Sequence, residues 1–137
     1  MSALTPYICV SDSRAAIDWY GEVFRATVKG KPYVMDDGRV GHVELRIGDA
    51  LLMMADPFPE VDVEPPDPSS GSAVSLHLEV ADCDAVAEAA MRNGAHLDRG
   101  PESTNHGRSA RRPSRTACPG PWRGTPRRTN RSLRVSR

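Results

Sequence analysis

The stretch PYICVSDSRAAIDWYGEVF, residues 6–24, indicates the fold of this chain. Residues 4–10 alternate between an apolar and a more polar face, as the residues of a β-strand do. Asp12 then lies where a helix N-cap is preferred. Residues 13–25 place apolar side chains at helical spacing. This part of the chain predicts a strand that leads directly into an amphipathic helix.

Three more strands are predicted after that helix, at residues 27–35, 39–47 and 51–55. The turn at residues 36–38 favours a hairpin because its glycine tolerates a positive φ. In the middle strand the alternation is regular, with one face formed by Val43, Leu45 and Ile47 and the other by His42, Glu44 and Arg46. The predicted order through residue 56 is therefore β, α, β, β, β.

The same order restarts 70 residues later. Val10-x-Asp12-x-x-Ala15 recurs as Val80-x-Asp82-x-x-Ala85. Each copy falls at a predicted strand-to-helix boundary, the second one between a strand at 73–80 and a helix at 83–93. Three identities are a weak match alone, but their coincidence with the same boundary indicates an internal repeat.

Four regions are expected from these patterns. They are a first βαβββ module at residues 1–56, a Pro-rich acidic linker at 57–72, a second, truncated module at 73–109, and an Arg-rich disordered tail at 110–137. Residues 56–72 hold five prolines and five acids without a base, which is typical of an exposed, semi-extended linker. Residues 108–137 show no apolar periodicity, so we expect too little buried surface to offset the ordering entropy.

The formal net charge of zero conceals an asymmetry. Residues 1–102 contain all 18 acidic residues and 8 basic ones, whereas residues 103–137 contain ten arginines and no acid. Ten guanidinium groups would bind phosphate nonspecifically and in a salt-dependent way. Because no recognised nucleic-acid module or aromatic platform accompanies them, we expect no specific nucleic-acid partner.

The composition also limits the location of the protein. No apolar run approaches the roughly 18 residues that a membrane span needs, and no signal pattern opens the chain, so we expect a cytoplasmic protein without a membrane partner. The three cysteines, Cys9, Cys83 and Cys118, are widely spaced and form no CxxC motif. They indicate neither a disulfide framework nor a zinc knuckle.

Several motifs of the two repeats carry a resemblance to a known family. They are Ala16-Ile17-Asp18-Trp19-Tyr20, Glu44-Leu45-x-Ile47-Gly48-Asp49, Leu52-Met53-Met54-x-Asp56 and Ser75-Leu76-His77-Leu78-Glu79-Val80. In their order and spacing, residues 3–109 resemble the vicinal oxygen chelate superfamily, which includes glyoxalase I, bleomycin-resistance proteins and extradiol dioxygenases. The resemblance implies an α+β fold, in which paired βαβββ modules form a curved mixed sheet, or cup, with the helices outside and the second module incomplete.

The polar faces of the predicted strands indicate where a binding site is expected. A strand face covered by a helix must be apolar, because unpaired polar groups buried there are costly. We therefore expect the other face to line the cup. The candidate ligand-binding residues on it are Tyr7, His42, Glu44, Arg46, His77 and Glu79. The sequence does not distinguish catalytic residues among them.

The metal ligands that the resemblance implies are largely missing. Metal-dependent members use a His on the first strand, a carboxylate on the fourth, a His opening the second module and a Glu on the last strand. Here Thr5 and Ser75 stand at the two His positions, and the fourth strand offers Leu51, Leu52, Met53 and Met54. His77 is the one weak candidate ligand. We therefore expect no cofactor, with a divalent metal as the alternative.

The end of the second module departs from the family pattern as well. Gly107-Arg108-Ser109-Ala110 resembles the start of the family's closing segment, and an Arg- and Pro-rich sequence follows it. We interpret this change as a reading-frame shift near residue 110 in a GC-rich gene.

Two main functions follow from this reading. The first is binding of a small, aromatic or cationic molecule in the cup without the usual metal site, as in the bleomycin-resistance branch. The alternative is a metal-dependent lyase or dioxygenase of the same superfamily, and a third reading is a truncated product without function. Whether the chain is an enzyme stays open at this point. The resemblance also implies a homodimer.

Overall fold

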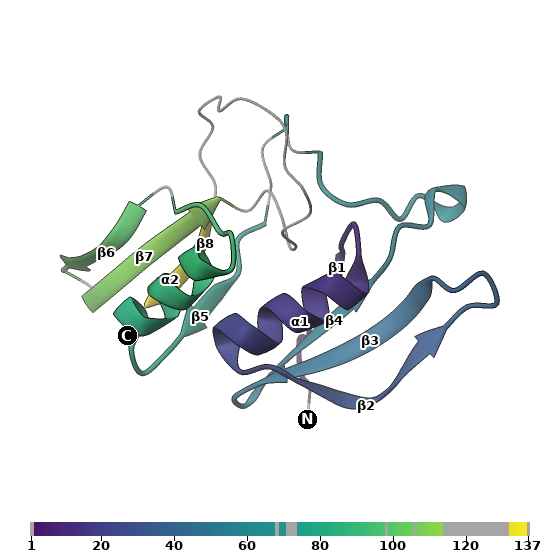
Figure 1. Ribbon diagram of the computed structural model, residues 1–137, viewed down its shortest axis with the longest axis horizontal. Helices are drawn as coiled ribbons and strands as arrows, with labels where there is room; N and C mark the ends of the chain where they lie inside the picture. Colours follow the sequence, from purple (N-terminus) through teal and green to yellow (C-terminus); the bar gives the residue numbers. More distant parts are fainter. Residues whose placement is uncertain are drawn as a thin grey trace. The chain divides into compact units, whose positions relative to one another are not determined.

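The computed structural model describes residues 2–67, 69–70, 74–97, 99–105, 107–113 and 132–136. The chain divides into two compact units, unit 1 at Met1–Pro66 and unit 2 at Asp67–Arg137. In each unit one helix accompanies a four-stranded sheet, in the order β, α, β, β, β (Figure 1). The prediction of an α+β fold made of paired βαβββ modules is confirmed.

Unit 1 follows the order that its sequence pattern predicts. Its elements are β1 (Tyr7–Cys9), α1 (Ser13–Phe24), β2 (Thr27–Val34), β3 (Val40–Ile47), β4 (Ala50–Ala55) and a 3₁₀ turn at Pro59–Val61. The strands lie in the order β1-β4-β3-β2, where β1 is parallel to β4 and the other pairs are antiparallel. The hairpin between β2 and β3 lies where the glycine-containing turn at residues 36–38 is predicted, and a second hairpin joins β3 to β4.

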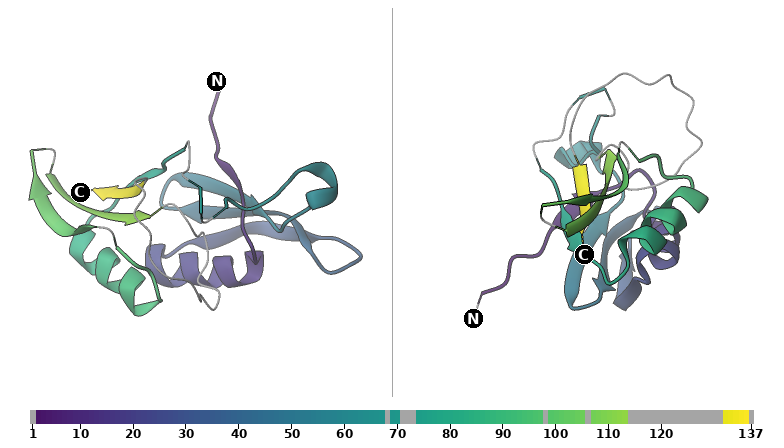
Figure 2. Two further views of the ribbon diagram at one scale, coloured as in Figure 1. Left: turned by 90° about the horizontal axis from the view of Figure 1, so that it is seen from above. Right: turned by 90° about the vertical axis from the view of Figure 1, so that its left-hand side faces the viewer.

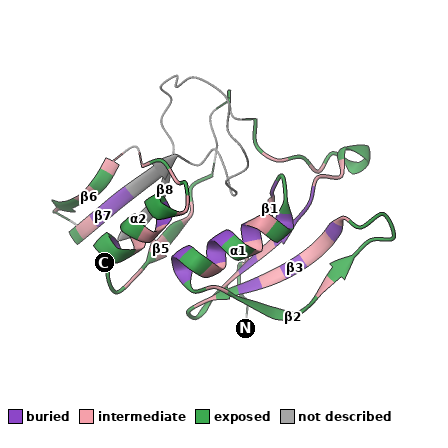
Figure 3. Cartoon of the chain, viewed as in Figure 1, coloured by how far each residue is buried: buried purple, intermediate pink, exposed green. Residues whose placement is uncertain are grey.

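The core of unit 1 lies between α1 and one face of the sheet. The helix runs along that face (Figure 2). Leu45 and Met54 are fully buried under it, and the aromatic side chains of Trp19, Tyr20 and Phe24 reach the core from the helix. Buried and half-buried residues alternate along the middle of β3 (Figure 3), so the predicted two faces of this strand are confirmed.

Two carboxylates hold the start of α1. The side chain of Asp12 accepts a hydrogen bond from the backbone N–H of Ala15 at 3.0 Å, as an N-cap residue does. Asp56, which follows β4 and is 8 % exposed, accepts from the N–H of Ser13 at 2.7 Å and from the N–H of Val40 at 2.6 Å. Asp56 therefore joins the first turn of the helix to the start of β3.

The edge strand β2 is irregular in its middle. Lys29 pairs with Glu44, but the next residue in register is Tyr33, opposite His42, so extra residues of β2 bulge between these two pairs. Gly30 in the bulge has a φ of 74°, which glycine adopts without a Cβ clash. The bulge divides β2 into two short paired segments.

Arg39 fastens the predicted linker to this unit. Its guanidinium donates to Asp37 and to Glu60, each at 2.7 Å, and to the carbonyl oxygen of Pro57 at 3.1 Å. It also lies 4.0 Å from the ring centroid of Phe58. The beginning of the predicted linker is therefore attached to unit 1 instead of being a free, extended segment. The guanidinium of Arg39 holds it through Pro57, Phe58 and Glu60.

Unit 2 repeats the arrangement with a smaller core. Its elements are β5 (His77–Glu79), α2 (Cys83–Arg92), β6 (Arg99–Thr104), β7 (Gly107–Pro113) and β8 (Ser132–Ser136), in the sheet order β5-β8-β7-β6. Among its described residues the buried apolar ones are Cys83, Ala87, Ala90 and Ala110. A bidentate ion pair between Arg108 on β7 and Asp84 on α2 adds a link between helix and sheet.

The internal repeat has the same local geometry in both units. Asp82 caps α2 by accepting from the N–H of Ala85 at 3.0 Å, as Asp12 does with Ala15 in α1. The shared residues are therefore the ones that turn a strand into a capped helix.

The end of the chain differs from the expected disordered tail. β7 continues past residue 109 to Pro113, and β8 pairs with β7 in an antiparallel and with β5 in a parallel register. β8 therefore supplies the strand that the sequence interpretation left out. The pairing of β8 uses backbone N–H and C=O groups, which are present in an Arg-rich sequence as in any other. Residues 114–131 lie outside the described residues, so the expectation for them stays a prediction.

Candidate functional site

The polar face of unit 1 is the side of its sheet that faces away from α1. His42, Glu44 and Arg46 lie on it, because they alternate along β3 with the buried residues Val43 and Leu45. His42 and Glu44 are half-buried, and Arg46 is exposed. The sequence pattern placed these three residues on one face, and the alternation of burial agrees with it.

Strand register extends this face across the whole sheet. Tyr7 on β1 pairs with Met53 on β4, Met53 pairs with Glu44 on β3, and Glu44 pairs with Lys29 on β2. Since directly paired residues point to the same side of a sheet, these four side chains form one row. Polar and charged groups from β1, β3 and β2 are thereby brought together, with Met53 of β4 between Tyr7 and Glu44.

The side chain of Tyr7 extends from this row to the backbone of Gly41 and the side chain of His42 on β3. Its hydroxyl donates to the carbonyl oxygen of Gly41 at 3.0 Å and lies 3.2 Å from Nδ1 of His42. The two rings are 5.4 Å apart with an angle of 38° between their planes. Because the single phenol proton is directed to Gly41, the geometry favours the tautomer in which Nδ1 of His42 donates to Tyr7.

Partial burial raises the pKa of Tyr7 above its usual value, and the nearby Cys9 thiol raises it further. Since even an ordinary phenol, with a pKa of about 10, is protonated at neutral pH, the hydroxyl of Tyr7 is the donor in its hydrogen bond to Gly41.

Glu44 connects His42 to a lysine. Its carboxylate lies 2.9 Å from Nζ of Lys29 and 3.6 Å from Nε2 of His42, which forms an ion pair only when the imidazole is protonated. The hydrogen bond and charge of Lys29, and secondarily His42, lower the pKa of Glu44 below its usual range. The site therefore contains a series of neighbouring polar side chains, Tyr7, His42, Glu44 and Lys29, on a partly exposed surface.

Removing the lysine tests this arrangement. In Lys29→Met the pKa of Glu44 should rise towards that of a free carboxyl, measured by NMR titration of the side-chain carboxyl carbon. A depressed folded-state pKa stabilises the fold above the unfolded pKa of about 4.3. That contribution is lost as the pH falls through the folded-state pKa, so Lys29→Met should weaken the acid dependence of stability. Lys31→Met is the matched control, and an equal rise in both variants would contradict the assignment.

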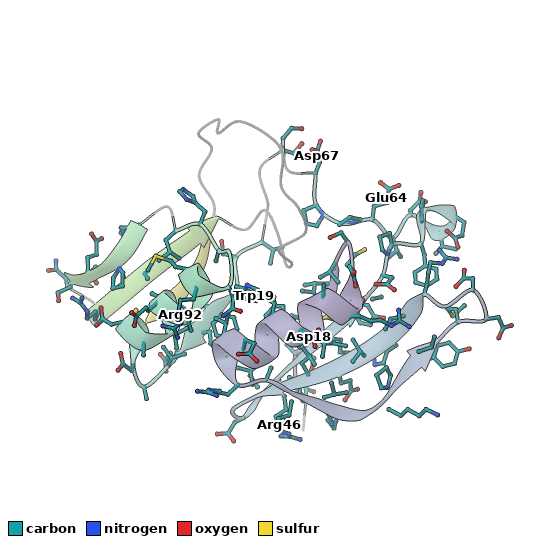
Figure 4. The ribbon with its side chains drawn as sticks, viewed as in Figure 1. Asp18, Trp19, Arg46, Glu64, Asp67 and Arg92 are labelled. Atoms are coloured by element: carbon teal, nitrogen blue, oxygen red, sulfur yellow. The ribbon has the colours of Figure 1, made fainter. Side chains whose placement is uncertain are left out.

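Arg46 lies apart from the Tyr7–His42 contact. It pairs with Thr27 and Leu51, towards the turn that joins β3 to β4 (Figure 4). Among the side chains that the structure describes, none forms an ion pair with Arg46. The structure therefore places this predicted residue on the polar face but outside the series of Tyr7, His42, Glu44 and Lys29.

His77 and Glu79 belong to unit 2. They are the two ends of β5, exposed on either side of the half-buried Leu78, and so share one face of their own strand. This agrees with the predicted alternation. Their participation in a common site with His42 and Glu44 stays a prediction.

Three residues of the polar face were not among the predicted site residues. Lys29 forms the ion pair with Glu44, and the side chains of Tyr33 and Met35 lie against Gly41. The alternation of Tyr33 and Met35 in the predicted strand 27–35 was a usable signal. The alternation does not reveal the bulge before Tyr33, and this bulge determines which residue of β3 lies opposite Tyr33.

The described residues do not fit a metal site. No group of three or more His, Cys, Asp and Glu side chains that could hold an ion occurs among them. His42 and Glu44 supply one nitrogen and one carboxylate, and the hydroxyl of Tyr7 is directed to a backbone carbonyl. Burial also raises the pKa of Cys9 and of Cys83, which keeps both thiols protonated. We therefore derive no chemical step through a metal ion.

No helix in the part of the chain that the structure describes has the length and apolarity needed to cross a membrane.

Known proteins with a similar sequence or fold identify the family. The model of the Glyoxalase/Bleomycin resistance protein/Dioxygenase superfamily matches residues 3–113. An uncharacterized protein of Mycobacterium bovis is 34 % identical over 96 residues, which are 68 % of this chain and 62 % of that protein. A corresponding uncharacterized protein of Mycobacterium tuberculosis has the same identity, and the match spans 56 % of its length. The chain thus matches less than two thirds of either relative.

Solved structures share the fold. TnmS3, an antibiotic binding protein from Streptomyces sp. CB03234, superposes with a TM-score of 0.60 at 19 % identity, covering 99 % of this chain and 95 % of that one. The fosfomycin resistance protein FosX from Listeria monocytogenes, in complex with Mn(II) and a dihydroxypropylphosphonic acid, has a TM-score of 0.63 at 11 % identity, covering 99 % and 92 %. Together with the match over residues 3–113, these findings show that the chain belongs to the Glyoxalase/Bleomycin resistance protein/Dioxygenase superfamily.

Proposed function

We propose that this protein binds a small organic molecule on the polar face of unit 1, without a metal ion. The observation that carries the proposal is the series of neighbouring polar side chains Tyr7, His42, Glu44 and Lys29, which spans three strands beside partly exposed apolar side chains. Fixed polar groups next to apolar surface are the usual makeup of a small-molecule site. The antibiotic-binding function of TnmS3, a protein of the same fold, supports the proposal.

The chemistry of the face favours binding over catalysis. A general base must lie within hydrogen-bond reach of the proton that it takes. Nδ1 of His42 faces Tyr7, Nε2 of His42 lies 3.6 Å from the carboxylate of Glu44, and that carboxylate is paired with Lys29, so each basic atom already has a neighbouring group of the protein. These groups are arranged to hold polar substituents of a ligand. Arg46 is a further proposed contact of that ligand, and His77 and Glu79 are proposed ligand-binding residues of unit 2.

A fragment titration tests the proposed function. A set of neutral and charged one- and two-ring compounds is added to the isotope-labelled chain, and the backbone amide shifts are followed by NMR. We expect some compounds to shift the amides of residues 41–44, and expect His42→Ala to abolish those shifts. His96→Ala, which removes an exposed histidine of unit 2, is the matched control. The proposal would fail if no compound perturbed residues 41–44.

The metal-dependent alternative has a direct test. The Mn(II) complex of FosX shows that a protein of this fold holds a metal, and the pair of His42 and Glu44 is the nearest approach to a ligand set here. We expect purified protein to contain far less than one metal ion per chain by elemental mass spectrometry. Stoichiometric zinc, nickel, iron or manganese that is lost in His42→Ala would favour the lyase or dioxygenase instead.

We further propose that the protein forms a homodimer and resides in the cytoplasm. Both proposals rest on the family resemblance and on the sequence, and sedimentation analysis of the full chain tests the first.

A further inference from the structure

The helix α2 of unit 2 ends in a cap formed by Asn93 and Gly94. The N–H of Gly94 donates to the carbonyl oxygen of Met91 at 3.0 Å, and the N–H of Ala95 donates to that of Ala90 at 2.9 Å. These are the two hydrogen bonds of a Schellman motif. Gly94 has a φ of 83°, which a residue with a side chain rarely adopts. The cap therefore requires a glycine directly after Asn93.

The side chain of Asn93 is part of this cap. Its Nδ2 donates to the carbonyl oxygen of Ala89 at 2.8 Å. The same carbonyl oxygen accepts from the backbone N–H of Asn93 at 3.1 Å, so backbone and side chain both tie Asn93 to the helix. Asn93 is half-buried and Gly94 is exposed. Water therefore reaches the cap at the surface of unit 2.

The same pair of residues is chemically labile. When the backbone nitrogen of Gly94 attacks Cγ of Asn93, an N–Cγ bond forms and the Cγ–Nδ2 bond breaks. The side-chain nitrogen leaves as ammonia, together with the proton of the glycine N–H. Water then opens the cyclic imide at either carbonyl group and leaves an aspartate or an isoaspartate. Glycine hinders this attack least because it has no Cβ. Asn93 precedes a glycine, whereas Asn105 and Asn130 precede a histidine and an arginine.

The folded cap opposes this reaction. Ring closure requires Cβ of Asn93 and the nitrogen of Gly94 to be eclipsed about the Cα–C bond, which in an L residue corresponds to a ψ of roughly −120°. The ψ of Asn93 is 26°, so the two reacting atoms are held apart. The N–H of Gly94 and the Nδ2 of Asn93 are also engaged in hydrogen bonds to Met91 and Ala89. The end of α2 must therefore open before Asn93 reacts.

We infer that Asn93 is a modification site of this chain, at which loss of the side-chain amide keeps the end of α2 open. The carboxylate that forms has no proton to donate to the carbonyl oxygen of Ala89, and it places a negative charge at the negative end of the helix dipole. An isoaspartate also lengthens the backbone by one methylene, which moves Gly94 and Ala95 away from their acceptors. Because α2 packs against β6 and β7, a transient opening becomes a lasting change in unit 2.

Ageing of the full chain tests the site. The chain is kept at a mildly alkaline pH and then digested with trypsin, which releases Asn93 in the peptide 93–99 and Asn105 in the peptide 100–108. Mass spectrometry detects replacement of the side-chain NH₂ by OH, against a sample digested without ageing. We expect the conversion to be at least about threefold faster at Asn93 than at the exposed Asn105, where a side chain hinders the attack. Equal rates, or an unchanged Asn93, would overturn the inference.

Unfolding tests the protection by the cap. In guanidinium chloride the conversion of Asn93 should be at least about tenfold faster than in the folded chain, since the last turn of α2 no longer has to open first. An equal rate in the folded chain would contradict the protection.

The variant Asn93→Asp tests the consequence of the modification without ageing. We expect hydrogen exchange of the Gly94 and Ala95 amides, followed by NMR, to accelerate about threefold to tenfold, because a donor is lost and a charge opposes the helix dipole. Asn105→Asp is the matched control. It introduces the same charge in the turn between β6 and β7 and should leave both exchange rates as in the parent chain. Unchanged exchange in Asn93→Asp would show that loss of the amide does not open the helix end.

Discussion

Asp56→Ala should lower the free energy of unfolding by about 3 kcal/mol, because two backbone N–H groups would lose a charged acceptor in a buried place. The carboxylate is 8 % exposed and accepts from Ser13 at 2.7 Å and from Val40 at 2.6 Å. Its loss would release both the first turn of α1 and the start of β3. Urea denaturation of the full chain, followed by circular dichroism, measures the change.

A conservative variant separates charge from shape at this position. Asp56→Asn keeps the size of the side chain and one acceptor oxygen, but places an NH₂ group against one of the two N–H donors. We expect a loss between that of the alanine variant and zero. Asp36→Ala, which removes an exposed carboxylate in the turn between β2 and β3, is the control and should change stability by less than about 0.5 kcal/mol. A loss for Asp56→Ala no greater than that of the control would show that the two hydrogen bonds do not hold α1.

Leu45→Ala should cost about 3 kcal/mol of stability, because it opens a cavity at the centre of unit 1. Leu45 is fully buried at 0 % exposure, between α1 and the sheet, next to the fully buried Met54 in the neighbouring strand. Amide hydrogen exchange of β3 and β4 in the full chain should accelerate accordingly.

Leu4→Ala is the control for that variant. It is the same substitution at the surface, because Leu4 is 99 % exposed. It should leave both stability and exchange rates unchanged. If Leu45→Ala left the exchange of β3 as slow as in the parent chain, the core would not lie where the structure places it.

The first module could be predicted well because its helix and its strands each show a regular spacing of apolar residues. The helical stripe that contains Trp19 and the strand alternation through Leu45 each specify a buried face, and the caps and turns between them mark the boundaries. Asp12 and Asp82 repeat that boundary at the same spacing in both modules. The tertiary role of Asp56 was not predictable, because its two partners, Ser13 and Val40, come from segments far from it in the sequence.

The candidate site could be predicted only in part. Alternation placed His42 and Glu44 on one face, but their partners Tyr7 and Lys29 depend on the order of strands in the sheet, which alternation does not determine. The bulge in β2 changes the register by extra residues and brings Tyr33 opposite His42. The strand β8 was missed because a five-residue alternation of Leu133 and Val135 is too short to recognise within an Arg-rich sequence.

The bulge in β2 also restricts how two copies of the chain could assemble. An open sheet edge is a template on which a second chain can continue the sheet. In unit 1 the uninterrupted part of that edge is short, since the backbone turns out of register after Lys29 and includes Pro32, which has no N–H to offer. Growth of a continuous intermolecular sheet along β2 would stop after a few residues. A dimer of this protein would therefore use side-chain contacts or another edge, and the same irregularity limits edge-to-edge pairing of further copies along β2.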